Sequence, residues 1–252
     1  MNARITLAVA HRVLIQLRRD RRTLAMLLVL PCLLISLLWW IYHDANPALF
    51  DSIGPALLAV FPVIVMFLVT SVTTLRERSS GTLERLLAMP MGKLDFLVGY
   101  AIAFGLVAAV QSVLAVGVSV GLLGLDVAGP LWLLTVVAVV DAVLGSALGL
   151  FVSAFARTEF QAVQFMPLVV IPQILLCGLF IPRDALPPVL GLISDVLPLS
   201  YAVDAMTTVS TISSSGDLAG VDPSVWGDLA VVVGFVLGAL ALGAATLRRR
   251  TA

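Results

Sequence analysis

The chain is organised around one charged stretch, Arg76-Glu77-Arg78-Ser79-Ser80-Gly81-Thr82-Leu83-Glu84-Arg85-Leu86-Leu87-Ala88-Met89-Pro90, which lies between two long apolar runs. A basic loop between apolar runs tends to stay on the cytoplasmic side of a membrane. From Thr82 to Met89 the leucines recur at helical spacing, and Pro90 and Gly92 break a helix. We therefore expect residues 76–91 to form a short amphipathic helix where membrane meets cytosol, able to contact a soluble protein.

The composition indicates an integral membrane protein. Of the 252 residues, 60% are hydrophobic and only 12% are charged, whereas a soluble domain carries about a quarter charged residues. Both cysteines fall inside apolar runs, where we expect them to pack as small hydrophobic side chains. The two histidines lie away from the centres of these runs, so the sequence predicts neither a metal site nor histidine-based catalysis.

Six apolar runs are long enough to cross a hydrocarbon core of about 30 Å as helices. We expect spans at 24–42, 53–75, 96–125, 131–155, 160–181 and 229–247. The third run would measure about 45 Å as a straight helix, so it must tilt, protrude or be interrupted. The predicted fold class is an all-α polytopic membrane protein with six transmembrane helices.

The distribution of basic residues predicts the orientation of these spans. Six crossings leave both termini on one side, and that side holds 14 of the 15 Lys and Arg residues, with Arg183 alone on the other. Basic residues near span ends favour the cytoplasm. We therefore expect both termini to be cytoplasmic.

Two further segments are predicted at the membrane surfaces. Residues 1–23 carry six arginines, and their apolar side chains recur on one helical face: Ile5, Val9, Val13, Leu17. This favours an N-terminal interfacial helix, with its apolar face in the lipid headgroups and its arginines toward anionic lipid or a cytosolic partner. The alternative is a basic flank that only fixes topology. Residues 183–208 are apolar but broken by prolines, which predicts re-entrant outer helices before the last span.

The order of these segments resembles the permease subunits of ABC-2 type transporters, in particular bacterial drug exporters of the daunorubicin-resistance kind. The resemblance covers the whole chain in topology and is most specific in the pattern Arg-Glu-Arg-x-x-Gly-Thr-x-Glu-x-Leu at 76–86. The stretches Phe180-Ile181-Pro182 and Leu197-Pro198-Leu199-Ser200-Tyr201 match more loosely. The resemblance implies that 76–91 is a coupling helix, seated in a cleft of a separate ATP-binding subunit.

The predicted function follows from this resemblance. The 252 residues contain no Gly-x-x-x-x-Gly-Lys-Ser/Thr phosphate loop, so we expect no enzyme activity and no cofactor on this chain, with ATP and Mg on the partner subunit. Six spans make half of a channel, which predicts a second permease copy or a related permease. We expect an exporter of amphipathic drugs or lipid-like molecules in the bacterial inner membrane, contacting lipid and no nucleic acid. Export of a polysaccharide or glycolipid, or a non-transport scaffold or channel, are the alternatives.

The coupling residues implied by the match are listed here: Arg76, Glu77, Arg78, Gly81, Thr82, Leu83, Glu84, Arg85, Leu86. We expect Glu77 and Glu84 to contact basic groups of the ATP-binding subunit, and Leu83 or Leu86 to fill its cleft. The alternative is an ordinary solvated loop whose charges only fix orientation.

A substrate path is predicted around Asp141 in the fourth span. An acid at mid-span costs about 2.5–3.5 kcal/mol on insertion scales, so it should face protein or water, where it can act as counter-ion to a cationic drug. The alternatives are a hydrogen bond with Gln111, Ser112 or Ser146, or a position nearer the outer interface. The other predicted path residues are glutamines that can also link helices: Gln111, Gln164, Gln173. An intramembrane enzyme is disfavoured, because no span contains a His, a Lys or a second acid that could activate Ser146.

Overall fold

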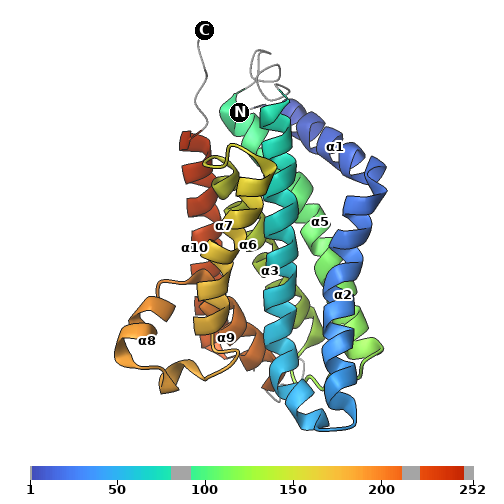
Figure 1. Cartoon of the computed structure of the whole chain (residues 1–252), viewed down its shortest axis with the longest axis vertical. Helices are drawn as coiled ribbons and strands as arrows, with labels where there is room; N and C mark the ends of the chain where they lie inside the picture. The colour runs from blue at the N-terminus through green and yellow to red at the C-terminus, as the bar shows by residue number, and fades with distance from the viewer. Residues whose placement is uncertain (1, 81–91, 212–221, 247–252) are drawn as a thin grey trace.

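Six long helices stand side by side in a bundle (Figure 1). The computed structural model describes residues 2–80, 92–211 and 222–246. The six helices are α2 (Arg21–His43), α3 (Pro47–Ser79), α5 (Lys93–Gly121), α6 (Leu131–Ser153), α7 (Glu159–Leu176) and α10 (Pro223–Thr246). Within those ranges every regular element is helical, and these six are long and apolar enough to cross a membrane. The prediction of an all-α protein with six spans is confirmed.

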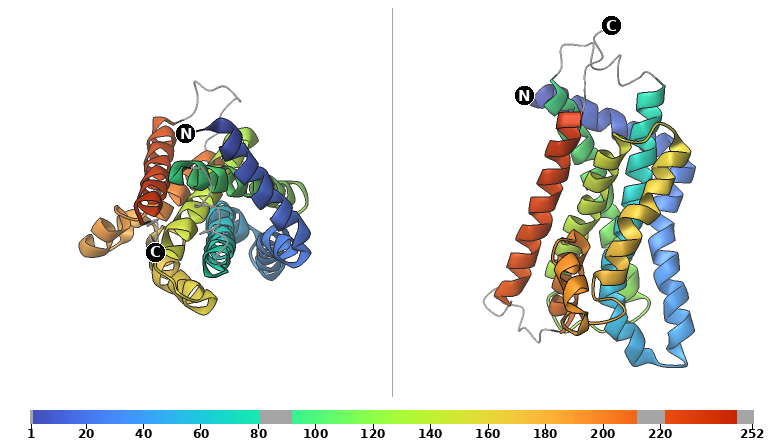
Figure 2. Two further views of the ribbon diagram at one scale, coloured as in Figure 1. Left: turned by 90° about the horizontal axis from the view of Figure 1, so that it is seen from above. Right: turned by 60° about the vertical axis from the view of Figure 1, so that its left-hand side comes forward.

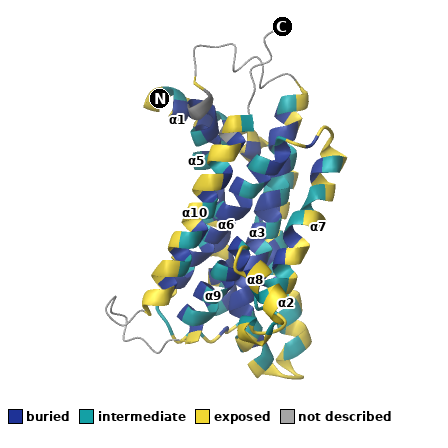
Figure 3. Cartoon of the chain, turned by 90° about the vertical axis from the view of Figure 1, so that its left-hand side faces the viewer, coloured by how far each residue is buried: buried dark blue, intermediate teal, exposed yellow. Residues whose placement is uncertain are grey.

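The centre of the bundle is the contact between α3 and α6, the most buried of the described spans (Figure 3). Two glycines of α6 make this contact close. A Cβ atom added to Gly145 would lie 2.5 Å from the carbonyl oxygen of Val63, and one added to Gly149 would lie 2.6 Å from that of Phe67. Small residues let helix backbones approach in lipid, where van der Waals packing drives association. The two glycines, one turn apart, therefore fix how α6 lies on α3.

Helix α3 is longer at both ends than the predicted span 53–75. It begins at Pro47, which suits the first turn of a helix because no N–H is needed there. It ends at Ser79, so residues 76–79 form its last turn and the amphipathic helix predicted for 76–91 does not begin at Arg76. The helix continues because its three terminal charged side chains find partners on neighbouring helices, as described below. Residues 81–91 of the predicted helix lie outside the described ranges.

Glycines end two spans earlier than predicted. Helix α5 stops at Gly121 instead of residue 125, and Gly124 then adopts a φ of +71° that other residues rarely take. The buried Leu125 folds back against Gly54, where an added Cβ would lie 2.5 Å from its Cδ1 atom. The long third apolar run is thus interrupted. Helix α7 ends at Leu176 instead of residue 181, shortly before Gly178 at a φ of +94°.

Other span boundaries also differ from the prediction, most of all the start of α10. Helix α6 covers 131–153 of the predicted 131–155, and α2 covers 21–43 against the predicted 24–42. Helix α10 begins at Pro223 instead of residue 229, where the Ser224 N–H donates to Oδ1 of Asp222 over 2.9 Å. An acidic side chain that accepts from the first turn is a common helix start.

The N-terminal helix α1 (Ala3–Arg19) crosses one end of the bundle (Figure 2). Its apolar face, predicted to lie in lipid headgroups, packs against α5 and α2 instead; its buried residues include Val9, Val13 and Leu17. Gly99 of α5 permits this approach, because a Cβ there would lie 2.8 Å from the Thr6 carbonyl oxygen. The helix forms where the sequence predicts it, but protein covers its apolar side.

The chain from residue 183 to 211 forms short helices at the opposite end (Figures 1 and 2). A 3-10 turn, η1 (Arg183–Ala185), leads into α8 (Pro188–Ser194) and α9 (Pro198–Thr211), and the two α-helices are bent by 88°. Helix α9 packs against α10, α3 and α6, while α8 projects from the edge of the bundle. These elements occupy the segment predicted as re-entrant at 183–208.

Candidate functional site

Three consecutive charged residues in the last turn of α3 each contact a different helix. The Arg76 guanidinium pairs with both carboxylate oxygens of Glu159 in α7, at 3.0 and 3.1 Å. Glu77 accepts from Nη2 of Arg12 in α1 at 3.0 Å. Arg78 donates to the Ser153 carbonyl oxygen at the end of α6, at 2.9 Å. The end of α3 is therefore fastened to α1, α6 and α7 together; we name these three contacts the α3 hub.

The Arg12–Glu77 pair is the most enclosed ion pair of the α3 hub. The Glu77 side chain is 10% exposed and that of Arg12 is 28% exposed, against 61% and 47% for Arg76 and Glu159. Ion pairs taken out of water interact more strongly but are costly to break by removing one partner. This pair should therefore hold α1 to α3 more firmly than the exposed pair holds α7.

A second anchor joins α1 to the beginning of α5. Oδ1 of Asp95 accepts from the Asn2 N–H at 2.8 Å and from the Thr6 hydroxyl at 3.2 Å. Its Oδ2 accepts from the Gly92 N–H at 3.0 Å and so caps α5. Helix α1 is thus held at its first turn by α5 and further along by α3.

The structure places only part of the predicted coupling set. Arg76, Glu77 and Arg78 belong to the α3 hub. Glu77 pairs with Arg12 of its own chain, whereas the family resemblance implies a basic group of a partner subunit. The others lie outside the described ranges: Gly81, Thr82, Leu83, Glu84, Arg85, Leu86. Docking to a second protein stays a prediction for all nine. Arg12 is a site residue that the sequence did not reveal. The available signal was its position in the predicted α1, next to Val13 of the apolar face.

Asp141 and Gln111 are completely buried at mid-bundle. Among the residues that the structure describes, neither side chain has a hydrogen-bond partner. The alternative partners for Asp141 are used elsewhere: Ser112 donates to the Ala138 carbonyl at 2.9 Å, and Ser146 donates to its own helix. The Ser112 bond joins α5 to α6 next to Gln111 and one turn from Asp141. Two buried polar side chains without a hydrogen bond therefore lie on the neighbouring helices α5 and α6.

The other two predicted path residues lie elsewhere. The buried Gln173 donates to the Val169 carbonyl at 2.9 Å and accepts from the Leu199 N–H at 3.4 Å, which links α7 to α9. Gln164 is exposed on α7. The structure does not bring the four path residues together, and Gln173 acts as a link between helices.

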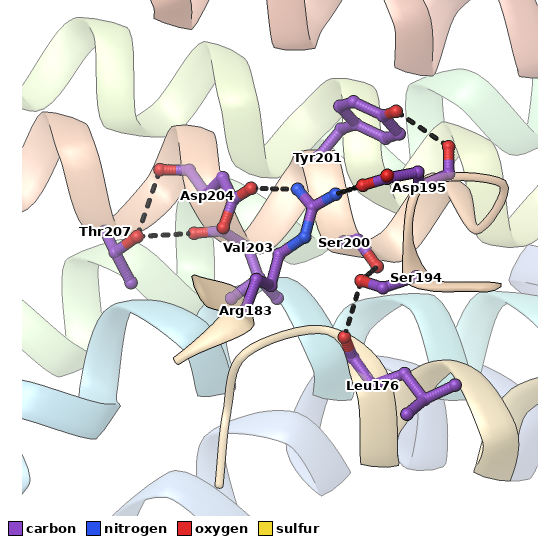
Figure 4. Close-up of polar contacts among 9 residues, drawn as sticks. All are labelled: Leu176, Arg183, Ser194, Asp195, Ser200, Tyr201, Val203, Asp204 and Thr207. Carbon is purple, nitrogen blue, oxygen red and sulfur yellow. Dashed lines mark hydrogen bonds and ion pairs between the residues drawn. The ribbon is translucent and has the colours of Figure 1, made fainter. Parts of the chain in front are cut away.

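At the opposite end of the bundle, Arg183 holds the short outer helices together (Figure 4). Its guanidinium pairs with Asp204 of α9 and, at 2.6 Å, with Asp195 at the end of α8. It also lies 5.0 Å from the ring centre of Tyr201, whose hydroxyl donates to the Asp195 carbonyl at 2.7 Å. Burial lowers the pKa of Arg183, but the bonds and charges of Asp204 and Asp195 outweigh burial and raise it overall.

These outer helices border an open cleft of about 1150 Å³. Hydroxyl groups and six aspartates line it: Asp51, Asp126, Asp184, Asp195, Asp204, Asp228. Neither the cleft nor the Arg183 pairs are predicted from the sequence. The signal was present, since Arg183 is the one basic residue predicted on that side, among many aspartates. An acidic cleft attracts cations and repels anions.

Comparison with known proteins identifies the family. The sequence profile described as "ABC-2 type transporter" matches residues 5–210. The chain belongs to the ABC-2 type transporter family. The resemblance drawn from residues 76–86 and the order of spans is therefore confirmed.

Three relatives illustrate the likeness. The chain is 27% identical over 164 residues to "Probable multidrug ABC transporter permease YbhR" of Escherichia coli, covering 65% of this chain and 45% of that one. It is 28% identical over 161 residues to "Inner membrane transport permease YhhJ" of the same species, 63% and 43% of the two chains. It is 21% identical over 202 residues to "ABC transporter G family member 23" of Dictyostelium discoideum, 80% and 28%. The matched part is less than half of each relative.

Proposed function

We propose that this chain is the permease subunit of an ATP-driven exporter that moves amphipathic drugs or lipid-like molecules out of the cell. A separate ATP-binding subunit supplies the motion, and a second permease copy completes the path. Family membership supports the permease role, and the name of YbhR supports a drug-like substrate. Because the chain matches less than half of that relative, the substrate and the assembly are part of the proposal.

The α3 hub is the observation that carries this proposal. Residues 81–91, the predicted contact with the ATP-binding subunit, directly follow α3 in the chain. Any displacement at residue 80 acts first on the last turn of α3, which is tied to α1, α6 and α7. A change of access needs two states with different contacts. Moving the hub as one unit tilts several spans relative to α10, which takes no part in it.

The charges at the two ends of the bundle support an orientation. One end carries the α3 hub and the arginines of α1; the other carries the aspartate-lined cleft. Basic ends favour the cytoplasm, so the hub faces the cytosol and the cleft opens outside a bacterial inner membrane. An acidic outer cleft suits release of cationic amphiphiles, because it attracts them away from the bilayer.

The decisive experiment is co-expression with a candidate ATP-binding subunit, followed by substrate-stimulated ATP hydrolysis in vesicles. Glu84→Gln should weaken capture of that subunit and the stimulated rate at least about tenfold, because an unpaired charge is then left at the interface. Asp44→Asn, which removes one exposed acid from the turn after α2, is the matched control and should change neither. A protein that captures no such subunit, or a Glu84→Gln variant equal to the control, contradicts the proposal.

A further inference from the structure

The elbow between α1 and α2 concentrates unpaired positive charge. Helix α1 ends at Arg19, α2 begins at Arg21, and a single residue, Asp20, separates them. Four arginines of this elbow are exposed: Arg18, Arg19, Arg21, Arg22. Within the described ranges none of the four makes an ion pair with an acidic side chain. We call these four residues the elbow arginines.

Asp20 offsets only part of this charge, and its position explains why the elbow keeps its shape. Its carboxylate accepts from the Thr23 N–H at 3.2 Å and from the Thr23 hydroxyl at 2.7 Å, which caps α2. The hydrogen bond from the Thr23 side chain is the largest cause that lowers the pKa of Asp20, so its charge is retained at neutral pH. Four arginines and one aspartate leave a net positive charge of about three at one tight turn.

The elbow lies at the edge of the bundle, and its outer side is not covered by another described helix. In Figure 1 it lies at the periphery, and lower along the bundle axis than the end of α3. From the elbow, exposed apolar side chains follow one face of α2 at spacings of three and four residues: Met26, Val29, Leu33, Leu37. A positive turn is thus continuous with an apolar stripe that points along the membrane normal.

We propose that the elbow arginines and this stripe bind one anionic phospholipid of the adjacent leaflet, with its phosphate at the arginines and an acyl chain along α2. Arginine suits phosphate because its planar guanidinium can make two parallel charge-assisted hydrogen bonds. Each basic side chain near an anionic membrane surface strengthens attraction to it. The bound lipid anchors the C-terminal end of α1, whose first turn is fixed by Asp95 and whose middle is fixed by Glu77.

A docked acidic protein fits these observations less well. The elbow lies beside the membrane-facing stripe of α2 rather than beyond the end of α3, and the stripe itself needs an apolar occupant. The inference rests on the six-span placement in a membrane and does not depend on which molecule is exported.

The test uses the purified full chain in neutral detergent, without any ATP-binding subunit. Native mass spectrometry measures binding of phosphatidylglycerol and of phosphatidylcholine with the same acyl chains. We expect phosphatidylglycerol to bind at least about tenfold more tightly, and the preference to disappear in the variant Arg19→Gln/Arg21→Gln/Arg22→Gln. The matched control Arg248→Gln/Arg249→Gln/Arg250→Gln removes the same charge and should keep the preference.

Two controls test the roles of the guanidinium groups and of the acyl chain. The corresponding Arg→Lys triple variant keeps the charge but lacks the planar guanidinium, so it should keep part of the preference and bind less tightly than the native chain. An unchanged unfolding temperature of the glutamine variant shows that its loss of binding is not misfolding. Excess inorganic phosphate should not displace the lipid, because phosphate lacks the chain that contacts α2. Equal binding of both lipids, displacement of the lipid by phosphate, or a glutamine variant that keeps the preference for phosphatidylglycerol overturns the proposal.

Discussion

Removing the carboxylate of Glu77 should uncouple α1 from α3. Exposed ion pairs contribute about 0.2–1 kcal/mol, and breaking a fully buried pair costs about 3–5 kcal/mol. The Arg12–Glu77 pair, with side chains 28% and 10% exposed at 3.0 Å, lies between these cases. We therefore expect a coupling energy of about 2 kcal/mol between the two side chains.

A double-mutant cycle measures this energy directly. The variants Arg12→Gln, Glu77→Gln and their combination are unfolded by SDS in mixed micelles, and the apparent free energies of unfolding are compared. The exposed pair Arg76–Glu159 is the matched control, and its cycle should give less than about 1 kcal/mol. If both cycles give the same value, or if the Arg12–Glu77 coupling is below about 0.5 kcal/mol, burial does not strengthen the pair and our reasoning is refuted.

The single variant Glu77→Gln also tests whether the Arg12–Glu77 pair transmits motion in the assembled transporter. With the ATP-binding subunit present, Glu77→Gln should still capture that subunit, because the Glu77 side chain is only 10% exposed and pairs with Arg12 of its own chain. Substrate-stimulated hydrolysis should fall, since α1 no longer follows α3. A variant that loses capture would instead place Glu77 in the docking surface.

Three other perturbations have clear expected outcomes. Gly149→Ala should destabilise the protein by about 1–3 kcal/mol in a thermal unfolding assay, because the added methyl group would lie 2.6 Å from the Phe67 carbonyl oxygen. The matched control is Gly238→Ala, whose methyl group would meet nothing within 4 Å, so it should be neutral or stabilising in the same assay. Arg183→Gln should leave Asp195 and Asp204 unpaired and speed proteolysis between α8 and α9, and unchanged cleavage rates would argue against a holding role. Asp141→Asn should raise or preserve the unfolding temperature, because a neutral amide is cheaper to bury than a carboxylate without a partner; a fall would reveal a partner for the acid.

The sequence predicted the features that depend on local composition. Apolar runs of sufficient length located all six spans, since lipid requires apolar side chains over a fixed length. The periodicity of Val9, Val13 and Leu17 located α1. The family pattern at 76–86 predicted the correct family, although most of those residues lie outside the described ranges.

Contacts between distant parts of the chain were beyond the sequence. The sequence predicts that residues 76–79 begin a separate interfacial helix, yet they form the last turn of α3, where Arg78 donates to the Ser153 carbonyl oxygen at a sequence distance of 75 residues. The apolar face of α1 looked suited to lipid, but Gly99 on another helix lets it pack on protein. Neither outcome follows from local pattern, because each depends on which helices are neighbours.

Helix α3 is not equally stiff along its length. Its 33 residues correspond to about 50 Å, and its internal prolines, Pro55 and Pro62, both fall in the half that leads away from the α3 hub. Each proline removes one backbone hydrogen bond and so makes bending easier. A displacement of the last turn of α3 should therefore move the helix as a rigid body as far as Pro62. Beyond Pro62 the helix bends more easily, so its first half, which borders the outer cleft, can change direction relative to the rest.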